Sequence, residues 1–354
     1  MGRPQPSLTA VRVLAAVDKF RGTATAQDVA AAIGHACWDL GHDCTEVPLA
    51  DGGEGTLEVL GGPNRRTRVT DPLGRPVEAE WRLSQGTAVI EMARASGLAL
   101  VGGGATNDPI AASTIGTGEL IDAALNDGAR RIIVGVGGSA TIDGGLGAIR
   151  AIRAPARLKA IDFVVACDVR AAFSDAARLF GPQKGATPAQ VEFLTRRLAR
   201  LADDYRRDYG VDVGSLPGAG AAGGLAGGLA ALGARLVEGF DVVSEEVGLD
   251  ELVEAHDLVI TGEGYLDPES FDGKVVGGVH DTCARAGRPV AVICGAADDV
   301  ARRGRDVTTL VERFGSTDAI ERTAWCVEQI ARDVVSRHAA TATRTSSDAS
   351  KRRD

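Results

Sequence analysis

Acidic residues follow several apolar runs in this 354-residue sequence, at the points where buried strands would end. Asp18 and Asp51 come after the first two runs, Asp168 after a central one and Glu263 after a later one. In an open α/β sheet the ligand crevice lies outside the carboxyl ends of the strands. Carboxylates gathered there, beside backbone that can approach a ligand closely, predict a site for phosphate groups and a divalent cation.

Glycine-rich segments accompany these acids, and glycine supplies 46 of the 354 residues. Residues 51–56 combine three glycines with two acids, although a surface turn of this composition is the alternative. Residues 137–141 combine two glycines with two hydroxyl side chains, and their N–H groups could surround an anion. A tight strand-to-helix turn is the alternative there. The residues singled out in these two segments are Asp51, Gly52, Gly53, Glu54, Gly137, Gly138, Ser139 and Thr141.

A third segment, residues 218–223, fits the pattern G-x-G-x-x-G through Gly218, Gly220 and Gly223. Glu238 lies 20 residues beyond Gly218, as in a dinucleotide-binding fingerprint, but no apolar strand leads into the first glycine. An NAD-dependent dehydrogenase is therefore kept as an alternative class only. A Gly/Ala helix packed closely on a neighbour and a backbone cradle for phosphate are the other two interpretations.

Composition and spacing argue against several other classes. The net charge is −9, with 39 Lys and Arg against 48 Asp and Glu, and no basic run lies in the body of the chain. The six cysteines are scattered, as is typical of reduced thiols, and the five histidines lack zinc-ligand spacing. No Walker A motif exists, because Val275 follows Gly273-Lys274 and Pro268 occupies the first-glycine position. We expect a cytoplasmic protein without nucleic-acid or membrane partners.

The elements that must position these residues alternate between strands and helices. A strand over residues 11–17, a helix between Thr25 and Gly41 and a strand over 45–49 form a βαβ unit. Further strands are expected at 87–92, 131–136, 163–166, 258–261 and 290–294, with a helix over 117–126 that Thr117 would cap. This alternation predicts an α/β fold. Residues 339–354 are expected to form a disordered tail.

Taken together, the motifs identify a known pattern: the sequence resembles the bacterial two-domain glycerate kinase family over nearly all of residues 10–335. Ten blocks carry the resemblance in the family's order. In this sequence they stand at residues 18–22, 48–56, 71–76, 90–98, 116–119, 137–141, 166–169, 180–186, 217–224 and 260–274.

The resemblance implies ATP-dependent phosphorylation of D-glycerate with Mg²⁺, in a cleft between two α/β domains. The 2-hydroxyl is favoured as acceptor, giving 2-phosphoglycerate. One domain, with a doubly wound and mostly parallel sheet of the Rossmann or flavodoxin type, would be discontinuous and consist of residues 1–72 and 240–338. The second α/β domain, residues 73–239, would be inserted into it. A homodimer is the default oligomeric state.

The resemblance also suggests a role for each singled-out residue. Asp18, or else Asp267, would accept the proton of the glycerate hydroxyl, and Asp168 is the third catalytic acid. Asp51 and Asp168 would bind Mg²⁺, with Glu263 next in preference. The residues expected to bind substrate are Lys19, Arg21, Asp51, Gly52, Gly53, Glu54, Glu263 and Lys274. The residues expected to bind ATP are Gly137, Gly138, Ser139, Thr141, Lys184, Gly218, Gly220 and Gly223.

The sequence departs from the family pattern at four places. Lys19 and Arg21 stand where the family usually has Ser and Lys, and Ile142 stands where it has Asn. Tyr265 replaces an Arg after Gly-Glu-Gly, which removes a bidentate partner for a carboxylate or phosphate. The segment between residues 148 and 162 is shorter than the family's by a few dozen residues. A catalytically weak relative that binds glycerate or a nucleotide is therefore the second alternative.

Overall fold

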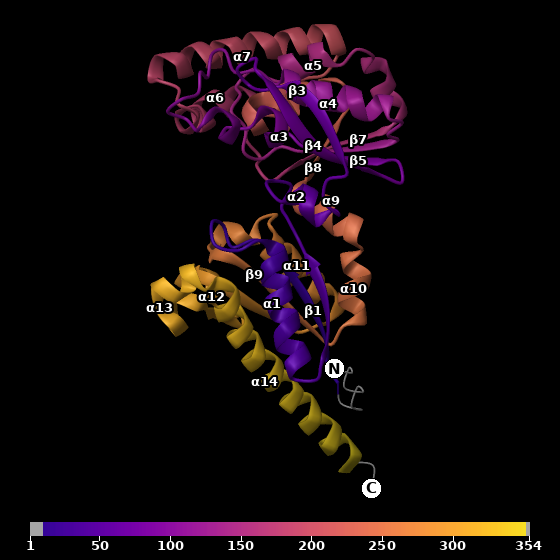
Figure 1. The fold of residues 1–354 in the computed structure, drawn as a ribbon, viewed down its shortest axis with the longest axis vertical. Helices are drawn as coiled ribbons and strands as arrows, with labels where there is room; N and C mark the ends of the chain where they lie inside the picture. Colours follow the sequence, from indigo (N-terminus) through magenta and orange to yellow (C-terminus); the bar gives the residue numbers. More distant parts are fainter. Residues whose placement is uncertain (1–9, 352–354) are drawn as a thin grey trace. The chain divides into compact units, whose positions relative to one another are not determined.

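The computed structural model describes residues 10–351, with side chains described up to residue 341, and divides into two compact units. The first, here called the terminal unit, combines the chain up to Ala50 with the chain from Val243 onward. The second, the central unit, is Asp51–Val242. Figure 1 colours the chain by residue number, so the terminal unit is both indigo and orange to yellow.

The terminal unit contains a five-stranded, fully parallel sheet in the order β11-β10-β9-β1-β2. Counted along this unit alone, the strand order is 2-1-3-4-5, the flavodoxin-like doubly wound arrangement. The order reverses between β1 and β9, and such a reversal point is where ligands bind in these sheets. The strands are β1 (Arg12–Val17), β2 (Asp43–Pro48), β9 (Leu258–Leu266), β10 (Val290–Ala297) and β11 (Val307–Thr309).

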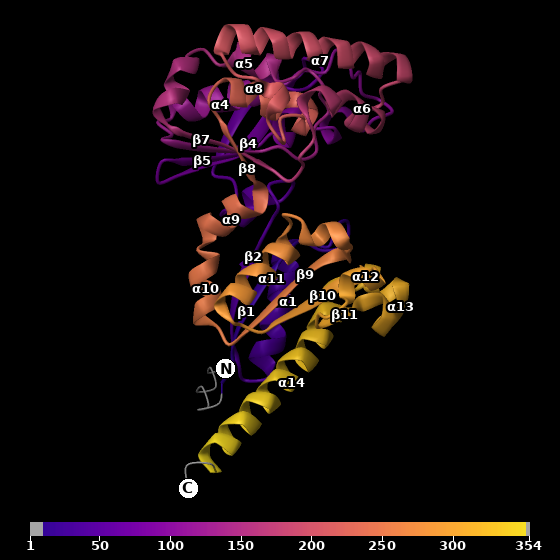
Figure 2. The same cartoon turned by 180° about the vertical axis from the view of Figure 1, so that it is seen from behind.

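Helices cover both faces of this sheet, and β1 is therefore buried along almost its whole length. On one face α1 and α14 pack on Val13, Ala15 and Val17, whereas α11 and α10 lie on the opposite face (Figures 1 and 2). A capping box between Thr25 and Asp28 begins α1. The helices are α1 (Ala26–Asp39), α10 (Leu249–Ala255), α11 (Val275–Ala286), α12 (Asp299–Arg302), α13 (Leu310–Glu321) and α14 (Thr323–Lys351).

The central unit contains a six-stranded mixed sheet in the order β3-β4-β5-β6-β7-β8. The pairs β3-β4 and β4-β5 are antiparallel, whereas β5, β6, β7 and β8 run parallel to one another. One large core joins the sheet to α4, α5, α7 and α8, and a smaller cluster around Ile133 and Val164 lies on the other face. The strands are β3 (Arg65–Thr70), β4 (Pro76–Ser84), β5 (Thr87–Glu91), β6 (Arg131–Gly135), β7 (Asp162–Cys167) and β8 (Arg235–Glu238).

The helices of the central unit vary from single turns to the 22 residues of α7. They are α2 (Thr56–Val59), α3 (Ala93–Ser96), α4 (Ile115–Asn126), α5 (Leu146–Ala151), α6 (Ala176–Phe180), α7 (Pro188–Tyr209) and α8 (Leu225–Ala231). Helix α9 (Gly239–Val247) contains the point at which the central unit gives way to the terminal one. None of the described helices is both long and apolar enough to span a membrane.

The fold class is confirmed: two α/β units, one discontinuous with a doubly wound sheet and the other inserted into it. The boundaries differ from the expected ones, since the division falls after Ala50 and after Val242 rather than after residues 72 and 239. The reason is β3, which pairs with β4 along its length and so belongs to the central sheet.

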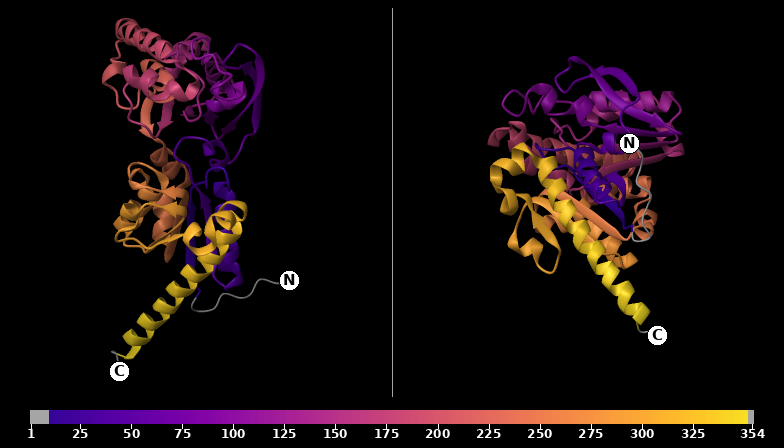
Figure 3. Two further views of the ribbon diagram at one scale, coloured as in Figure 1. Left: turned by 90° about the vertical axis from the view of Figure 1, so that its left-hand side faces the viewer. Right: turned by 60° about the horizontal axis from the view of Figure 1, so that its bottom comes forward.

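Residues 339–351 were expected to be disordered, but they form the last part of α14, which ends at Lys351. Residues 352–354 lie outside the described chain. Figure 3 shows this helix, in yellow, continuing well past the sheet of its own unit. Ala339 still packs against the core beneath α14, and the Thr341 hydroxyl donates to the Arg337 carbonyl 3.0 Å away. Alanine also favours the helical state intrinsically, so the Ala/Thr composition that indicated a tail is compatible with a helix.

Candidate active site

A cluster of charged side chains lies at the reversal point of the terminal sheet, where β1 ends beside the middle of β9. The Asp18 N–H donates to the Gly262 carbonyl at 2.9 Å, which joins the end of β1 to the middle of β9. The Asp18 carboxylate accepts the Lys19 N–H at 2.7 Å and lies 3.9 Å from the Lys19 ammonium. Gly264 of β9 allows the turn after β1 to approach closely, because a Cβ at this position would lie 3.2 Å from the backbone nitrogen of Arg21.

Glu263 is the central acid of this cluster. Its Oε1 atom is buried and has no hydrogen-bond partner among the described residues. Burial raises the pKa of Glu263 to about 7, and the nearby charges of Asp18 and Asp267 act in the same direction. Ser270 and the Lys274 ammonium oppose this rise without cancelling it. The result is a half-buried side chain with one buried carboxyl oxygen, and its pKa lies near neutral pH.

Asp267 and Lys274 begin the two helical segments that follow β9. The Asp267 carboxylate accepts from the Ser270 N–H at 2.9 Å and from its hydroxyl at 3.2 Å, as the cap of the short turn Pro268–Phe271. Lys274 precedes α11, and its ammonium lies 3.9 Å from the exposed Glu269 carboxylate. Asp267 thus fulfils a capping role, which the sequence had not assigned to it, and Ser270 is a site neighbour that the sequence analysis missed.

Two further residues of this region point toward solvent. Arg21 is exposed on the turn after β1, where Phe20 and Ala24 pair across a short bridge. Tyr265 is 55% exposed, and its hydroxyl donates to Asp298 at 2.7 Å. The side chain that replaces the family's Arg therefore binds an acid of its own unit.

In the central unit, the glycine-rich loops meet at the carboxyl ends of β6 and β7. A Cβ on Gly52 would lie 3.1 Å from the Ala166 carbonyl carbon, and one on Gly137 would lie 2.8 Å from the Gly53 Cα. Gly218 packs in the same way on Cys167. The structure thus brings together the segments around residues 51–55, 137–139, 167–169 and 218.

The acids of this region differ in their surroundings. Asp51 is half-buried and accepts the Gly53 N–H at 3.2 Å, which shapes the start of its own loop. Asp168 and Glu54 are exposed. No group of three His, Cys, Asp or Glu residues suited to a metal ion occurs within the described part of the chain. Mg²⁺ usually takes only one or two carboxylates together with substrate phosphates, so the donor chemistry of Asp51 and Asp168 fits it.

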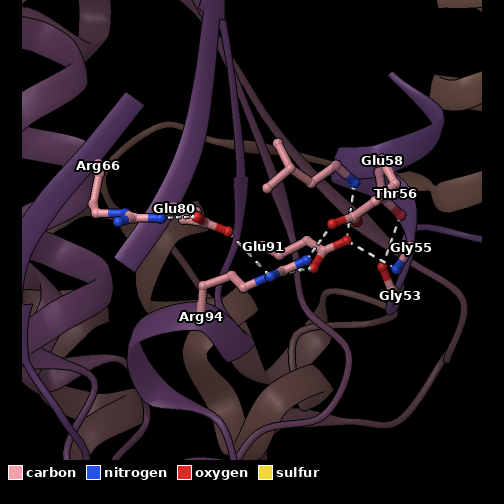
Figure 4. Close-up of polar contacts among 9 residues, drawn as sticks. Gly53, Gly55, Thr56, Glu58, Arg66, Glu80, Glu91 and Arg94 are labelled. Atoms are coloured by element: carbon pink, nitrogen blue, oxygen red, sulfur yellow. Dashed lines mark hydrogen bonds and ion pairs between the residues drawn. The ribbon is translucent and has the colours of Figure 1, made fainter. Parts of the chain in front are cut away.

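Glu91, a residue to which the sequence assigned no role, fixes the loop over residues 51–56. Its Oε1 accepts the N–H groups of Gly55 and Leu57, both at 2.9 Å, and its Oε2 receives Arg94 at 3.2 Å. Figure 4 shows the continuation of this network from Arg94 to Glu58 and Glu80. Glu91, at the end of β5, therefore fixes the backbone of the loop over residues 51–56.

Lys184 lies inside the protein rather than at a ligand-facing surface. It is 3% exposed, and its ammonium donates to the Ser139 hydroxyl at 2.6 Å and to the Thr141 carbonyl at 2.9 Å. Burial lowers the pKa of Lys184 to about 7, while the charge of Asp143 favours the protonated form. Lys184 therefore supports the 137–141 loop internally.

The fingerprint-like glycines are also explained by packing. A short 3₁₀ turn, Val213–Ser215, precedes Gly218 in place of a strand. A Cβ on Gly220 would lie 2.3 Å from the Ala172 carbonyl oxygen, and one on Gly223 would lie 1.9 Å from that of Thr141. Residues 218–223 are all buried, as expected for a segment in close contact with neighbouring backbone. A dinucleotide fingerprint requires a strand directly before its first glycine, and no strand precedes Gly218.

Comparisons with known proteins agree with this arrangement. The glycerate kinase family model matches residues 13–155 and 152–339. Glycerate 2-kinase of Escherichia coli is 38% identical over 360 residues, covering 89% of this chain and 94% of that protein. Glycerate kinase of Bacillus subtilis is 36% identical over 370 residues, covering 92% and 97%.

A solved structure extends the match to three dimensions. The crystal structure of a protein assigned as glycerate kinase 2 from Salmonella typhimurium LT2 superposes with a TM-score of 0.79 at 35% identity. The superposition covers 94% of this chain and 99% of that one. The chain described here is therefore an enzyme of the glycerate kinase family.

Proposed function

We propose that this enzyme transfers a phosphoryl group from ATP to the 2-hydroxyl of D-glycerate, giving 2-phosphoglycerate. Membership of the glycerate kinase family supports the acceptor, and relatives named glycerate kinase match most of the chain. The single observation that carries the chemistry is the buried Glu263 carboxyl beside Asp18 and Lys274, at the reversal point of a doubly wound sheet.

Glu263 is the proposed acceptor of the hydroxyl proton. A general base works best when its pKa lies near the operating pH, and the pKa of Glu263 is about 7. Its Oε1 atom has no partner among the described residues and so has capacity to accept a proton. The sequence favoured Asp18, but the Asp18 carboxylate is already bonded to the backbone of Lys19, and its negative charge helps to keep the pKa of Glu263 high.

Positive side chains around the same point would orient the anionic substrates. Lys19 and Lys274 are half-buried next to Asp18 and Glu263, and Arg21 is exposed on the adjoining turn. Phosphoryl transfer depends mostly on positioning and on charge neutralisation, with little covalent work for the protein. These three cations are proposed to hold the glycerate carboxylate and the transferred group.

The backbone of residues 137–141 is the proposed phosphate contact of the central unit. Gly138 has φ +68°, which favours glycine, and it is exposed. The Gly138 carbonyl accepts the Leu98 N–H, and the Ala140 N–H donates to the Ser96 carbonyl. The buried Lys184 ammonium donates to the Ser139 hydroxyl and to the Thr141 carbonyl. The loop is thus shaped before any ligand arrives, which is the condition for efficient electrostatic stabilisation.

Asp51 and Asp168 are the proposed ligands of Mg²⁺, and the loop at residues 52–54 adjoins them. When bound, the ion would supply charge neutralisation for the phosphates. Glu91 contributes by fixing the backbone that follows Asp51.

Three measurements separate this function from its alternatives. A coupled assay with ATP, Mg²⁺ and D-glycerate should release ADP, and omission of glycerate should reduce the rate to the blank. An NAD-dependent dehydrogenase would instead reduce NAD in the presence of glycerate. A weak relative that only binds would show thermal stabilisation by ATP or glycerate without ADP release, because binding to the native state alone raises stability. Either of the last two results would overturn the proposal.

A further inference from the structure

A pocket of about 450 Å³ lies on the central unit, away from the loops just described. It is formed by the middle of β3, one side of α4 from its first to its last residue, and the end of α5 with the residues just after it. Ile115 and two alanines contribute its apolar lining, and Arg68, Arg150 and Arg153 contribute positive charge. Pockets of this size accommodate small organic ligands.

The acids of the pocket are already engaged within the protein. Glu119 accepts the Thr70 N–H at 2.6 Å and the Thr70 hydroxyl at 3.1 Å. Asp122 accepts the Arg153 N–H at 3.0 Å and lies 3.9 Å from the Arg153 guanidinium. These bonds hold β3 and the chain after α5 against α4.

The remaining arginines have no such partners. Within residues 10–341, neither Arg68 nor Arg150 forms an ion pair with an acid. Arg presents a planar fork of donors that matches carboxylate and phosphate groups. Two such forks beside an apolar lining form a site of the kind that binds a small organic anion.

The pocket lies where this chain departs from its relatives. The family model matches in two segments that meet at residues 152–155, next to the pocket residues Arg150, Ala151 and Arg153. The alignment with the Escherichia coli enzyme extends over 360 residues although it covers only 89% of this 354-residue chain, so that relative carries residues that this chain lacks. Here only residues 152–161 connect α5 to β7.

We propose that this pocket binds a small organic molecule with two or more carboxylate or phosphate groups, held by Arg68, Arg150 and Arg153. The ligand would bridge β3 to the end of α5. Helix α5 begins at Leu146, three residues after the buried Asp143, which accepts the Gly145 and Gly147 N–H groups. The pocket lies at the opposite, C-terminal end of this helix, which the bound anion would stabilise. The proposal does not depend on the kinase activity.

The test uses the full-length protein without nucleotide or glycerate, with citrate as the tricarboxylate probe and pyrophosphate as the phosphate probe. Calorimetric titration at low salt should show binding of at least one probe. The double substitution Arg68→Gln with Arg150→Gln should weaken it about tenfold or more, because charge-assisted bonds are lost. Arg196→Gln, an exposed arginine of α7, is the matched control and should bind as the unchanged protein does.

A second measurement locates the bound probe. Amide exchange in residues 146–153 should slow when the probe is added, and Lys274→Met in the terminal unit should leave both effects intact. The proposal is overturned if neither probe binds at about 10 mM, a concentration at which even millimolar affinity is visible. It is also overturned if the double variant binds as well as the control.

Discussion

Glu263 is the residue at which the requirements of chemistry and of stability conflict most directly. A carboxyl that is ionised in water at neutral pH is buried here beside two other acids, and its pKa rises to about 7. The protein must desolvate the charge whenever Glu263 is ionised, and that desolvation lowers the stability of the fold. The same desolvation supplies a base matched to neutral pH.

The first prediction concerns the pH dependence of catalysis. Because the base acts only when deprotonated, kcat/KM should rise with pH through about 7 and then level off. Glu263→Gln should lower kcat by about 10²- to 10⁴-fold, the usual contribution of a general base, and should remove this acidic limb. Steady-state kinetics between pH 5.5 and 8.5 measure both. An unchanged limb in Glu263→Gln would assign the base to another residue.

The second prediction concerns stability, with the sign fixed by linkage. The folded-state pKa of Glu263, about 7, lies above its unfolded value of 4.5, so the folded state binds the proton more tightly. Stability should therefore fall as pH rises from about 4.5 to 7 and stay lower above that range. At 1.4 kcal/mol for each pKa unit, the loss is on the order of 3 kcal/mol.

Glu263→Gln removes this titration, so the variant should be more stable than the unchanged protein at pH 8 and lose that advantage near pH 5. Denaturant unfolding at the two pH values measures the difference. Glu254→Gln, an exposed carboxyl on α10, is the control and should give no such crossover. A variant that is equally destabilised at both pH values would contradict the burial argument.

At this scale the sequence could identify which acids follow strands but not how each is buried. Asp18, Glu263 and Lys274 were all singled out, and the structure places them together. The choice of Glu263 over Asp18 as base depends on desolvation, which is set by packing from distant segments. The Asp267-x-x-Ser270 spacing carried a capping signal that could have been used. Lys184 looked like a phosphate ligand because no sequence pattern showed that its ammonium is enclosed.

At the scale of elements, the central unit fixes its loops from the strand ends beneath them. Glu91, at the end of β5, accepts two N–H groups from the loop at residues 51–56. Glu91→Ala should leave these buried donors without partners and lower the unfolding free energy by about 2–4 kcal/mol. Faster amide exchange at Gly55 and Leu57 should accompany the loss. Glu80→Ala, at the exposed end of the same network, should change neither quantity appreciably.

The glycines of residues 218–224 provide a second element-scale prediction. Gly223 has φ +67°, and a Cβ there would lie 1.9 Å from the Thr141 carbonyl oxygen. Gly223→Ala should therefore cost about 3 kcal/mol or more through strain and overpacking. Gly214→Ala is the matched control, because its nearest neighbour would be 3.4 Å away, and it should change stability by less than about 0.5 kcal/mol. Equal effects in chemical denaturation would refute the packing explanation.

Local patterns predicted most elements but not the ends set by tertiary contacts. Apolar runs located β1, β6, β7, β9 and β10, because buried parallel strands are apolar on both faces. Thr117 was expected to cap a helix, yet α4 begins at Ile115, and the Thr117 hydroxyl bonds to the Ser96 hydroxyl at 2.8 Å. The polar strand β3 gave no apolar signal, so the division between the units was placed too late in the sequence.

At the scale of the whole molecule, each unit has its own sheet and its own core. The flavodoxin-like order of the terminal sheet explains why Asp18 and Glu263, 245 positions apart in sequence, lie close together at the point where the strand order reverses. Close backbone contacts in the central unit explain part of the glycine content, and many further glycines in both units adopt the positive φ that favours this residue.

Product identification by ³¹P NMR, after incubation with ATP, Mg²⁺ and D-glycerate, shows directly whether the enzyme phosphorylates the 2-hydroxyl of glycerate. We expect the resonance of 2-phosphoglycerate to grow as that of the ATP γ-phosphate declines, with growth about 10²- to 10⁴-fold slower in Glu263→Gln. Accumulation of 3-phosphoglycerate would contradict the proposed acceptor hydroxyl. If the folded enzyme bound its ligands but formed no phosphoglycerate, the proposed phosphorylation of D-glycerate would be wrong.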